Sequence, residues 1–168
     1  SALKNSLSTI KGPAKVFNSQ EEVITAFENN NLNQDCIIVV RGQGPSANGM
    51  PELHKLTPIM SILQKKGFNI ALITDGRMSG ASGSFPAVIH ISPEAKKNGN
   101  LAKIQNDDLI ELNIKNGSLN LKVENKILEE RLPDYVEQES NGLGRELFSS
   151  FRDSVSIVNE GASVFKND

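Results

Sequence analysis

Residues 36–40 read Cys-Ile-Ile-Val-Val, a continuous apolar run in which four of the five side chains are β-branched. Such a run predicts a strand buried on both faces, because a strand with one solvent face alternates apolar and polar residues. Residues 69–74 contain a second apolar run and predict another strand. The segments around these two strands determine how the sheet is connected.

A helix is predicted between the two strands. Thr57-Pro58 is typical of an N-cap followed by proline at the first helical position, and Gly67 is placed to end the helix. Its predicted buried stripe consists of Ile59, Ile62 and Leu63. Strand, helix and strand in this order predict a parallel, right-handed βαβ crossover.

Glycine-rich loops follow both strands, at residues 41–49 and 75–83. Parallel neighbours end at the same edge of a sheet, and open α/β sheets usually bind their ligands there. We therefore expect Glu52 and Ser79 to line one crevice, although 27 positions separate them in the sequence. The second loop combines a carboxylate, hydroxyls and a guanidinium with glycines, which is typical of a ligand-binding loop.

The flanking segments add further elements. Residues 1–12, which lead into the pair Gly12-Pro13, are interpreted as a linker, and residues 14–17 predict a short strand. Residues 19–29 predict a helix that begins with a capping box. Residues 87–92 predict another strand, closed by Pro93.

Two alternating runs on either side of Asn116-Gly117 predict a β-hairpin at residues 109–123. A two-residue loop there pairs Ile114 with Leu119, Leu112 with Leu121 and Ile110 with Val123. Residues 142–165 predict a broken helical tail that packs back on the domain. The fold class expected is therefore α/β: a mixed, β-barrel-like domain over residues 13–168, with one βαβ crossover, this hairpin and a helical carboxyl-terminal tail.

Composition limits the possible partners. The chain has 168 residues and a net charge of −2, which gives no electrostatic reason to expect nucleic acid. No apolar run approaches the length of a membrane span and no leader opens the chain, so we expect a cytoplasmic protein with no membrane partner. The single cysteine, Cys36, is expected in the core and builds neither a disulfide nor a metal cluster by itself. The start at Ser1, without Met, reads like the middle of a longer chain.

The residues alone leave alternatives open at the second loop. Asp75 to Gly83 also fits a structural turn in which Asp75 accepts backbone N–H bonds. The lysine-containing phosphate loop, the dinucleotide-binding glycine pattern and the serine-hydrolase elbow are all absent. His90 fits a strand histidine, whereas His54, beside Glu52, fits a functional and a structural role equally well.

Residues 40–58 and 72–83 closely resemble the carboxyl-terminal part of the dihydroxy-acid and sugar-acid dehydratases. Residues 46–55, which read Ser-Ala-Asn-Gly-Met-Pro-Glu-Leu-His-Lys, resemble the branch of that family that acts on 6-phosphogluconate. Residues 144–148 and 160–163 in the tail are similar to the same branch. The resemblance therefore runs through most of the chain.

The resemblance implies a hydro-lyase that converts 6-phosphogluconate to 2-keto-3-deoxy-6-phosphogluconate in the Entner–Doudoroff pathway. It implies that Ser79 is the catalytic base and that Glu52 is a ligand of a divalent ion, Mg²⁺. Four further residues are expected to bind substrate: Asn48, Arg77, Gly80 and Ser82. A dehydratase for another sugar acid or dihydroxy acid, or a stand-alone metabolite-binding module, is the alternative.

The family also uses an iron–sulfur cluster, whose cysteines lie in an amino-terminal domain that this chain lacks. Cys36 does not match a cluster ligand. We therefore expect the missing domain to be the main partner, the full-length enzyme to be a homodimer and the fragment alone to be inactive.

Overall fold

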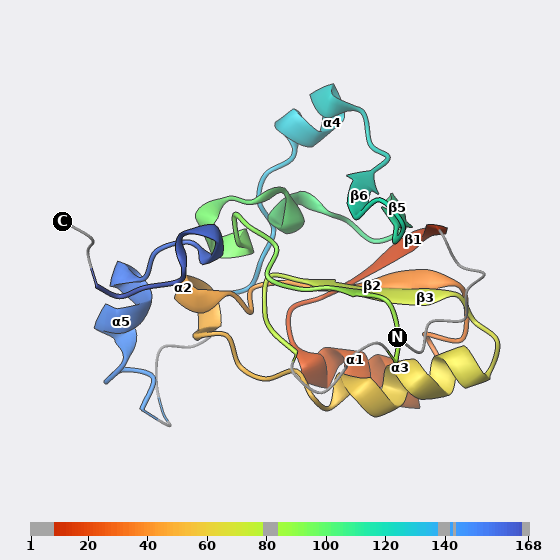
Figure 1. The fold of residues 1–168 in the computed structure, drawn as a ribbon, viewed down its shortest axis with the longest axis horizontal. Helices are drawn as coiled ribbons and strands as arrows, with labels where there is room; N and C mark the ends of the chain where they lie inside the picture. Colours follow the sequence, from red (N-terminus) through yellow and green to blue (C-terminus); the bar gives the residue numbers. More distant parts are fainter. Residues whose placement is uncertain (1–8, 79–83, 138–141, 143, 166–168) are drawn as a thin grey trace.

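The computed structural model describes residues 9–78, 84–137, 142 and 144–165. In this part of the chain, six strands form one sheet in the order β4-β3-β2-β1-β5-β6 (Figure 1). Neighbours from β1 to β4 run parallel, whereas β5 pairs antiparallel with β1 and with β6. The strands are β1 Thr9–Phe17, β2 Cys36–Val40, β3 Ile70–Thr74, β4 Ala87–Val88, β5 Leu109–Asn113 and β6 Ser118–Leu121. The curled, half-barrel sheet confirms the predicted mixed α/β class.

Helices lie on both faces of the sheet and beyond one end of it. α1 (Gln20–Glu28) and α3 (Leu56–Lys65) cover one face, and the 3-10 helices η1 (Ala95–Lys97) and η2 (Asn100–Lys103) lie on the other side (Figure 1). The short helices α2 (Pro45–Asn48) and α5 (Ser149–Ser154) pack together beyond the carboxyl end of β2. The remaining helices are α4 (Asn125–Glu130) and η3 (Val158–Glu160).

Two parallel crossovers build the middle of the sheet. β2, α3 and β3 form the predicted one, and the two strands pair from Cys36 with Ile70 to Val40 with Thr74. β1, α1 and β2 form a second crossover, where only one was expected. α1 begins as predicted, because Ser19 Oγ accepts the backbone N–H of Glu22 at 3.1 Å.

The core confirms the prediction for residues 36–40. Alternate side chains of β2 pack against α1 and α3 on one face and against η2 and β5 on the other. Cys36 is fully buried, and burial raises the pKa of its thiol to about 11. The thiol is therefore protonated at neutral pH and belongs to the core, as expected.

β1 begins at Thr9, four residues inside the segment interpreted as a linker, so residues 9–12 are strand. Residues 9–13 pair with β5, and residues 14–17 pair with β2. The partner changes beside Pro13, which has no N–H to donate to a neighbouring strand. The Gly12-Pro13 pair therefore marks a change of partner within one strand.

α3 begins two residues earlier than predicted. Its N-cap is Lys55, so Thr57 and Pro58 lie inside the first turn, where the missing proline N–H costs no helical hydrogen bond. Ile59 and Leu63 are buried as expected, but Ile62 is 41% exposed and Met60 is buried instead. Gly67 follows the helix with φ +98°, which confirms its role in ending it.

The predicted hairpin is confirmed, but its register is wrong by two residues. Leu112 pairs with Leu119 and Ile110 with Leu121, and residues 114–117 form a four-residue loop. The reason lies at Asn113, whose Oδ1 accepts the backbone N–H groups of Lys115 and Asn116, both at 3.1 Å, and so starts the turn early. A shift of two keeps the same side chains on the core face.

Two other elements are shorter than predicted. β4 ends at Val88, because His90 adopts φ +59°, and the interpretation of His90 as a strand residue is therefore wrong. Of the predicted helical tail, the described residues contain the short helices α5 and η3 alone. Val155 is buried, but Phe148 and Phe151 are more than half exposed, so the tail packs on α2 with part of its apolar surface open.

Among the helices in the described part of the chain, none combines the length and apolar character needed to cross a lipid bilayer.

Candidate active site

The two loops predicted to share a crevice meet at the carboxyl ends of β2 and β3. Glu52 and Arg77 form an isolated parallel bridge, and Arg77 Nη1 lies 3.4 Å from Glu52 Oε2. Arg77 Nε also donates to the carbonyl oxygen of Met50 at 2.7 Å. Two of the predicted site residues are therefore in contact, as the crossover required. Ser79, Gly80 and Ser82 lie outside the described residues.

Asp75 joins three segments beneath these loops. It is fully buried at the end of β3, and its Oδ1 accepts the backbone N–H of Gln43 at 2.9 Å. Its Oδ2 accepts the N–H groups of Gly42 at 3.1 Å and Ala95 at 2.9 Å. Burial raises the pKa of Asp75 against the opposing effect of these three donors, and the charge of Glu94 raises it further. The structural interpretation of Asp75 is thus confirmed.

Glu94 is a second buried carboxylate, which the sequence did not reveal. Its Oε1 accepts the N–H of Ser46 at 3.1 Å and its Oε2 that of Ala47 at 3.0 Å. Both donors belong to the first turn of α2, whose N–H groups have no partner within the helix. Gly44 is required beside it, because a Cβ there would lie 2.7 Å from Glu94 Cβ. Glu94 is 48 positions from Ser46, and no local pattern links the two.

Arg41 opens the first loop but has a structural role. It is 4% exposed, and its Nε donates to Asn18 Oδ1 at 3.0 Å. Nη1 donates to the carbonyl oxygens of Ala102 and Ile104, and Nη2 pairs with Asp134 at 3.0 Å. The guanidinium therefore fastens the loop to η2 and to the segment after α4.

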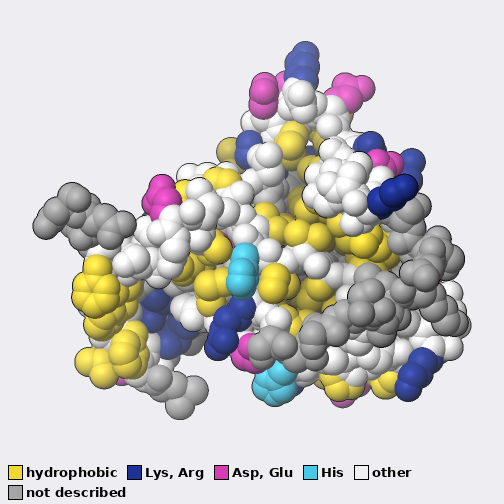
Figure 2. All heavy atoms as spheres, in the orientation of Figure 1, with side chains coloured by type: hydrophobic (Ala, Val, Ile, Leu, Met, Phe, Trp, Pro, Cys, Tyr) yellow, Lys and Arg dark blue, Asp and Glu magenta, His cyan; other side chains and the backbone are white. Residues whose placement is uncertain are grey.

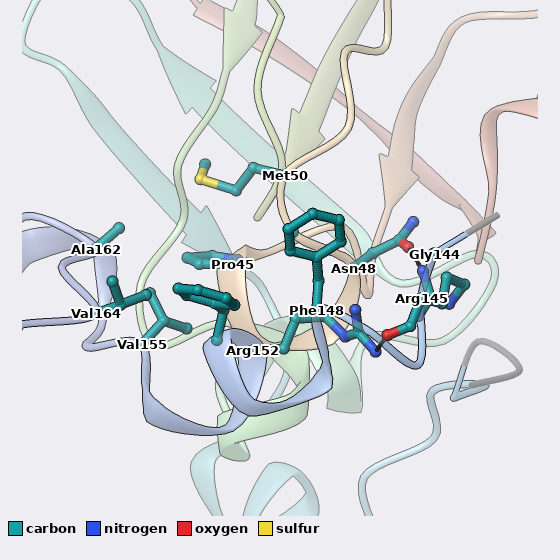
Figure 3. Close-up of a pocket in the computed structure, with 12 residues that line it drawn as sticks. Pro45, Asn48, Met50, Gly144, Arg145, Phe148, Arg152, Val155, Ala162 and Val164 are labelled. Carbon is teal, nitrogen blue, oxygen red and sulfur yellow. Dashed lines mark hydrogen bonds between the residues drawn. The ribbon is translucent and has the colours of Figure 1, made fainter. Parts of the chain in front are cut away.

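Asn48, the remaining predicted substrate-binding residue, lies at the end of α2. Its Nδ2 donates to Gln43 Oε1 at 3.0 Å, and its Oδ1 accepts a hydrogen bond from Arg145 Nη1. Asn48, Arg145 and Arg152 line a cavity of about 480 Å³ between α2 and the tail (Figure 3). The two arginines were not predicted as site residues, although Arg145 belongs to the tail segment that carries the family resemblance.

The histidines add little to the site in the described part of the chain. His54 is exposed, and His90 is exposed with its backbone N–H donated to the carbonyl oxygen of Gly76 at 3.0 Å. The backbone of His90 therefore positions the turn after β3.

Glu52 fits a metal ion only as one ligand of several. Its carboxylate is 23% exposed beside Arg77, and carboxylate oxygens are the usual protein ligands of Mg²⁺. The described residues contain no group of three His, Cys, Asp or Glu side chains that would hold a metal ion. Cys36 does not fit an iron–sulfur cluster, because cluster ligands are thiolates and its thiol is buried and protonated.

Comparison with known proteins identifies relatives of this chain. Residues 1–162 match the family model described as dihydroxy-acid/6-phosphogluconate dehydratase, C-terminal. The chain is 48% identical over 166 residues to a phosphogluconate dehydratase of Rhizobium meliloti, covering 98% of this chain and 27% of the relative. It is 49% identical over 156 residues to a phosphogluconate dehydratase of Escherichia coli, covering 92% of this chain and 26% of the relative.

A dihydroxy-acid dehydratase of Methanosphaera stadtmanae is 40% identical over 131 residues, which cover 77% of this chain and 23% of that protein. The chain thus spans about a quarter of the length of the curated relatives it matches. The family model covers nearly the whole chain, and the motifs at residues 40–58 and 72–83 lie within the matched range. The chain belongs to the dihydroxy-acid/6-phosphogluconate dehydratase family and corresponds to its carboxyl-terminal part.

Proposed function

We propose that this chain is the carboxyl-terminal part of a hydro-lyase that dehydrates 6-phosphogluconate to 2-keto-3-deoxy-6-phosphogluconate, the Entner–Doudoroff reaction. The observation that carries the proposal is its 48% identity over 98% of its length to a phosphogluconate dehydratase. The similarity to a dihydroxy-acid dehydratase is lower, 40%, and covers less of the chain. The phosphorylated sugar acid is therefore favoured over a branched-chain dihydroxy acid as substrate.

The reaction is a β-elimination with two chemical difficulties. The C2–H bond lies beside a carboxylate that is already an anion, so the proton is only weakly acidic. The hydroxyl on C3 is a poor leaving group unless it departs as water. A base must take the C2 proton while the C3 hydroxyl is protonated or polarised, and the resulting enol then becomes the 2-keto group.

Within this chain we assign the base to Ser79 and positive charge at the site to Arg77. Arg77 is held on two sides, by the Glu52 carboxylate and by the Met50 carbonyl, so its guanidinium is fixed at the start of the loop that carries Ser79. A serine hydroxyl is a weak base, and such fixed positive charge would stabilise its alkoxide. The same charge would bind the substrate carboxylate, with Asn48 and the amides of Gly80 and Ser82 as further donors.

Two groups that are not amino-acid side chains would complete the site. An iron–sulfur cluster and Mg²⁺ would supply Lewis acidity toward the leaving hydroxyl. Glu52 would provide one oxygen ligand to Mg²⁺, and the cluster thiolates would come from another part of the polypeptide because Cys36 does not fit. We therefore propose a longer, cytoplasmic, homodimeric enzyme in which this chain forms one wall of the active site and is inactive alone.

The proposal is tested in the full-length polypeptide that contains this chain. Ser79→Ala should abolish dehydration of 6-phosphogluconate while thermal unfolding and substrate binding, measured by calorimetry, stay close to wild type. Ser61→Ala, on α3 and away from the site, is the matched control and should retain turnover. Activity of Ser79→Ala within tenfold of wild type would refute the base, and turnover of an unphosphorylated dihydroxy acid instead of 6-phosphogluconate would overturn the substrate.

A further inference from the structure

The cavity between α2 and the tail has an unusual lining for a surface hollow. It measures about 480 Å³, which is within the range of small-molecule sites. Of the described residues that line it, the charged ones are Arg145 and Arg152, and none is acidic. The other walls are mostly apolar and include Met50, Phe148 and Val155 (Figure 3). Such a lining favours an anion, because apolar walls weaken the solvent screening of the two positive charges.

The two arginines are held in place by hydrogen bonds to neighbouring residues. Arg145 Nη1 donates to Asn48 Oδ1, which ties the tail to the end of α2. Arg152 Nη2 donates to the carbonyl oxygen of Arg145 at 2.7 Å. Arg152 forms no ion pair with any described residue.

The opposite side of the arginines is less suitable for an anion. A second cavity of about 340 Å³ is lined by the same two side chains together with Lys96, Glu137 and Asp153. Lys96 pairs with Glu137 at 2.9 Å, and Asp153 adds another negative charge. The carboxylates there offset the positive charge, so the anion is placed on the Met50 side.

The cavity also adjoins the proposed active site. Met50 lines it, and the Met50 carbonyl oxygen accepts the hydrogen bond from Arg77 Nε. Asn48 and Glu52 belong to one short segment, with Met50 between them. Figure 3 shows Met50 across the cavity from Arg152, with Phe148 between them. Met50 therefore borders both the cavity and the Glu52–Arg77 pair.

We propose that Arg152, supported by Arg145, binds the phosphate group of the substrate and so selects a phosphorylated sugar acid over an unphosphorylated one. The inference rests on the proposed function, since it assigns the end of the substrate farthest from the reacting carbons. A guanidinium suits phosphate because its planar N–H groups match two phosphate oxygens. Binding energy from such a remote group also contributes to positioning the reacting carbons.

The test uses the full-length enzyme with three variants: Arg152→Gln, Arg152→Lys and the control Lys115→Gln, which removes one positive charge from the remote hairpin loop. Inorganic phosphate and gluconate, the two halves of the substrate's chemistry, serve as competitive inhibitors. Arg152→Gln should raise the inhibition constant of phosphate and lower kcat/KM for 6-phosphogluconate by about tenfold to a hundredfold, as expected for one charge-assisted contact. For Arg152→Lys, both quantities should lie between those of wild type and Arg152→Gln. The inhibition constant of gluconate should stay within threefold of the wild-type value.

Two results would overturn the assignment. One is an inhibition constant of phosphate for Arg152→Gln within threefold of wild type, and the other is a rise in the inhibition constant of gluconate equal to that of phosphate. If wild-type enzyme does not dehydrate 6-phosphogluconate, the proposed function falls, and calorimetric titration with inorganic phosphate then decides the site separately. Binding by wild type that weakens at least tenfold in Arg152→Gln would support it. Equal binding by both proteins, or none by wild type, would reject it.

Discussion

Asp75 Oδ2 accepts the backbone N–H of Ala95 at 2.9 Å, and this single bond ties the loop after β3 to the start of η1. The same carboxylate accepts the N–H groups of Gly42 and Gln43, which begin the loop after β2. This carboxylate therefore joins its own loop to two segments that are distant in sequence. The Glu52–Arg77 pair is built on this arrangement, since Arg77 follows Asp75 by two residues.

Asp75→Asn should destabilise the protein strongly. The amide replaces one acceptor oxygen with an NH₂ group, which faces backbone donors and leaves at least one buried N–H without a partner. Such a loss costs about 1–3 kcal/mol, or more for a charged acceptor. Urea unfolding of the variant, with the exposed Asp153→Asn as control, measures it. A midpoint equal to that of the control would contradict the role of Asp75.

Gly44→Ala and Gly117→Ala should fail in different ways. At Gly44 the backbone φ is −70°, which alanine adopts freely, but the new Cβ would overlap the Glu94 side chain and displace the start of α2. At Gly117 the Cβ meets nothing within 4 Å, and the cost of about 1–2 kcal/mol arises from φ +68° alone. We expect Gly44→Ala to lose catalytic activity and Gly117→Ala to lose only stability. Comparing kcat/KM with the unfolding midpoint separates the two, and normal activity of Gly44→Ala would exclude the clash.

Asp108 should make part of the stability depend on pH. Burial alone would raise the pKa of Asp108. Arg131 Nη2 donates a hydrogen bond to Asp108 Oδ1 at 2.9 Å, and this bond and the positive charge of Arg131 hold the pKa below its usual value. A lowered folded pKa means that the contribution is complete above the unfolded value, about 3.9, and is lost as pH falls through the folded value. Asp108→Asn should cost about 1.5–3 kcal/mol at pH 7 and reduce the difference between urea midpoints at pH 5 and pH 3. An undiminished difference would argue against the pair.

Glu52→Gln should weaken the binding of Mg²⁺ in the full-length enzyme, so that more added Mg²⁺ is needed for the same activity. The reason is that an amide oxygen is a poorer ligand for a hard cation than a carboxylate. Glu21→Gln is the matched control, since Glu21 also forms a 3.4 Å ion pair, with Lys55, on the exposed side of α1. Titration of activity with Mg²⁺ measures the effect. Superimposable curves for wild type and Glu52→Gln would remove Glu52 from the metal site.

Local patterns in the sequence were sufficient for the central strands and for part of the site. The β-branched run at residues 36–40 predicted burial on both faces, and the crossover that follows it predicted that Glu52 would approach the loop after β3. Both inferences depend on periodicity and chain direction, which a single sequence contains. The family resemblance could also be recognised in a single sequence, because its motifs are continuous segments. The match to the family model confirms it.

Features set by contacts between distant segments were not predictable. Glu94 reaches the first turn of α2 from 48 positions away, and nothing near Pro93 indicates a cap. The register of the hairpin was decided by the side chain of Asn113, which competes with Asn116-Gly117 for the turn. Arg152 carried no signal of its own, because its place beside the cavity depends on how the tail packs against α2.

The change of partner within β1 also determines where the polypeptide can be cut for protein production. A version that starts at Pro13, where the sequence suggests a domain boundary, would keep the pairing with β2 but lose residues 9–12, which pair with β5. The hairpin would then present an unpaired strand that bears Ile110 and Leu112, an edge prone to join other molecules. A version that keeps this strand paired must therefore begin at or before Thr9.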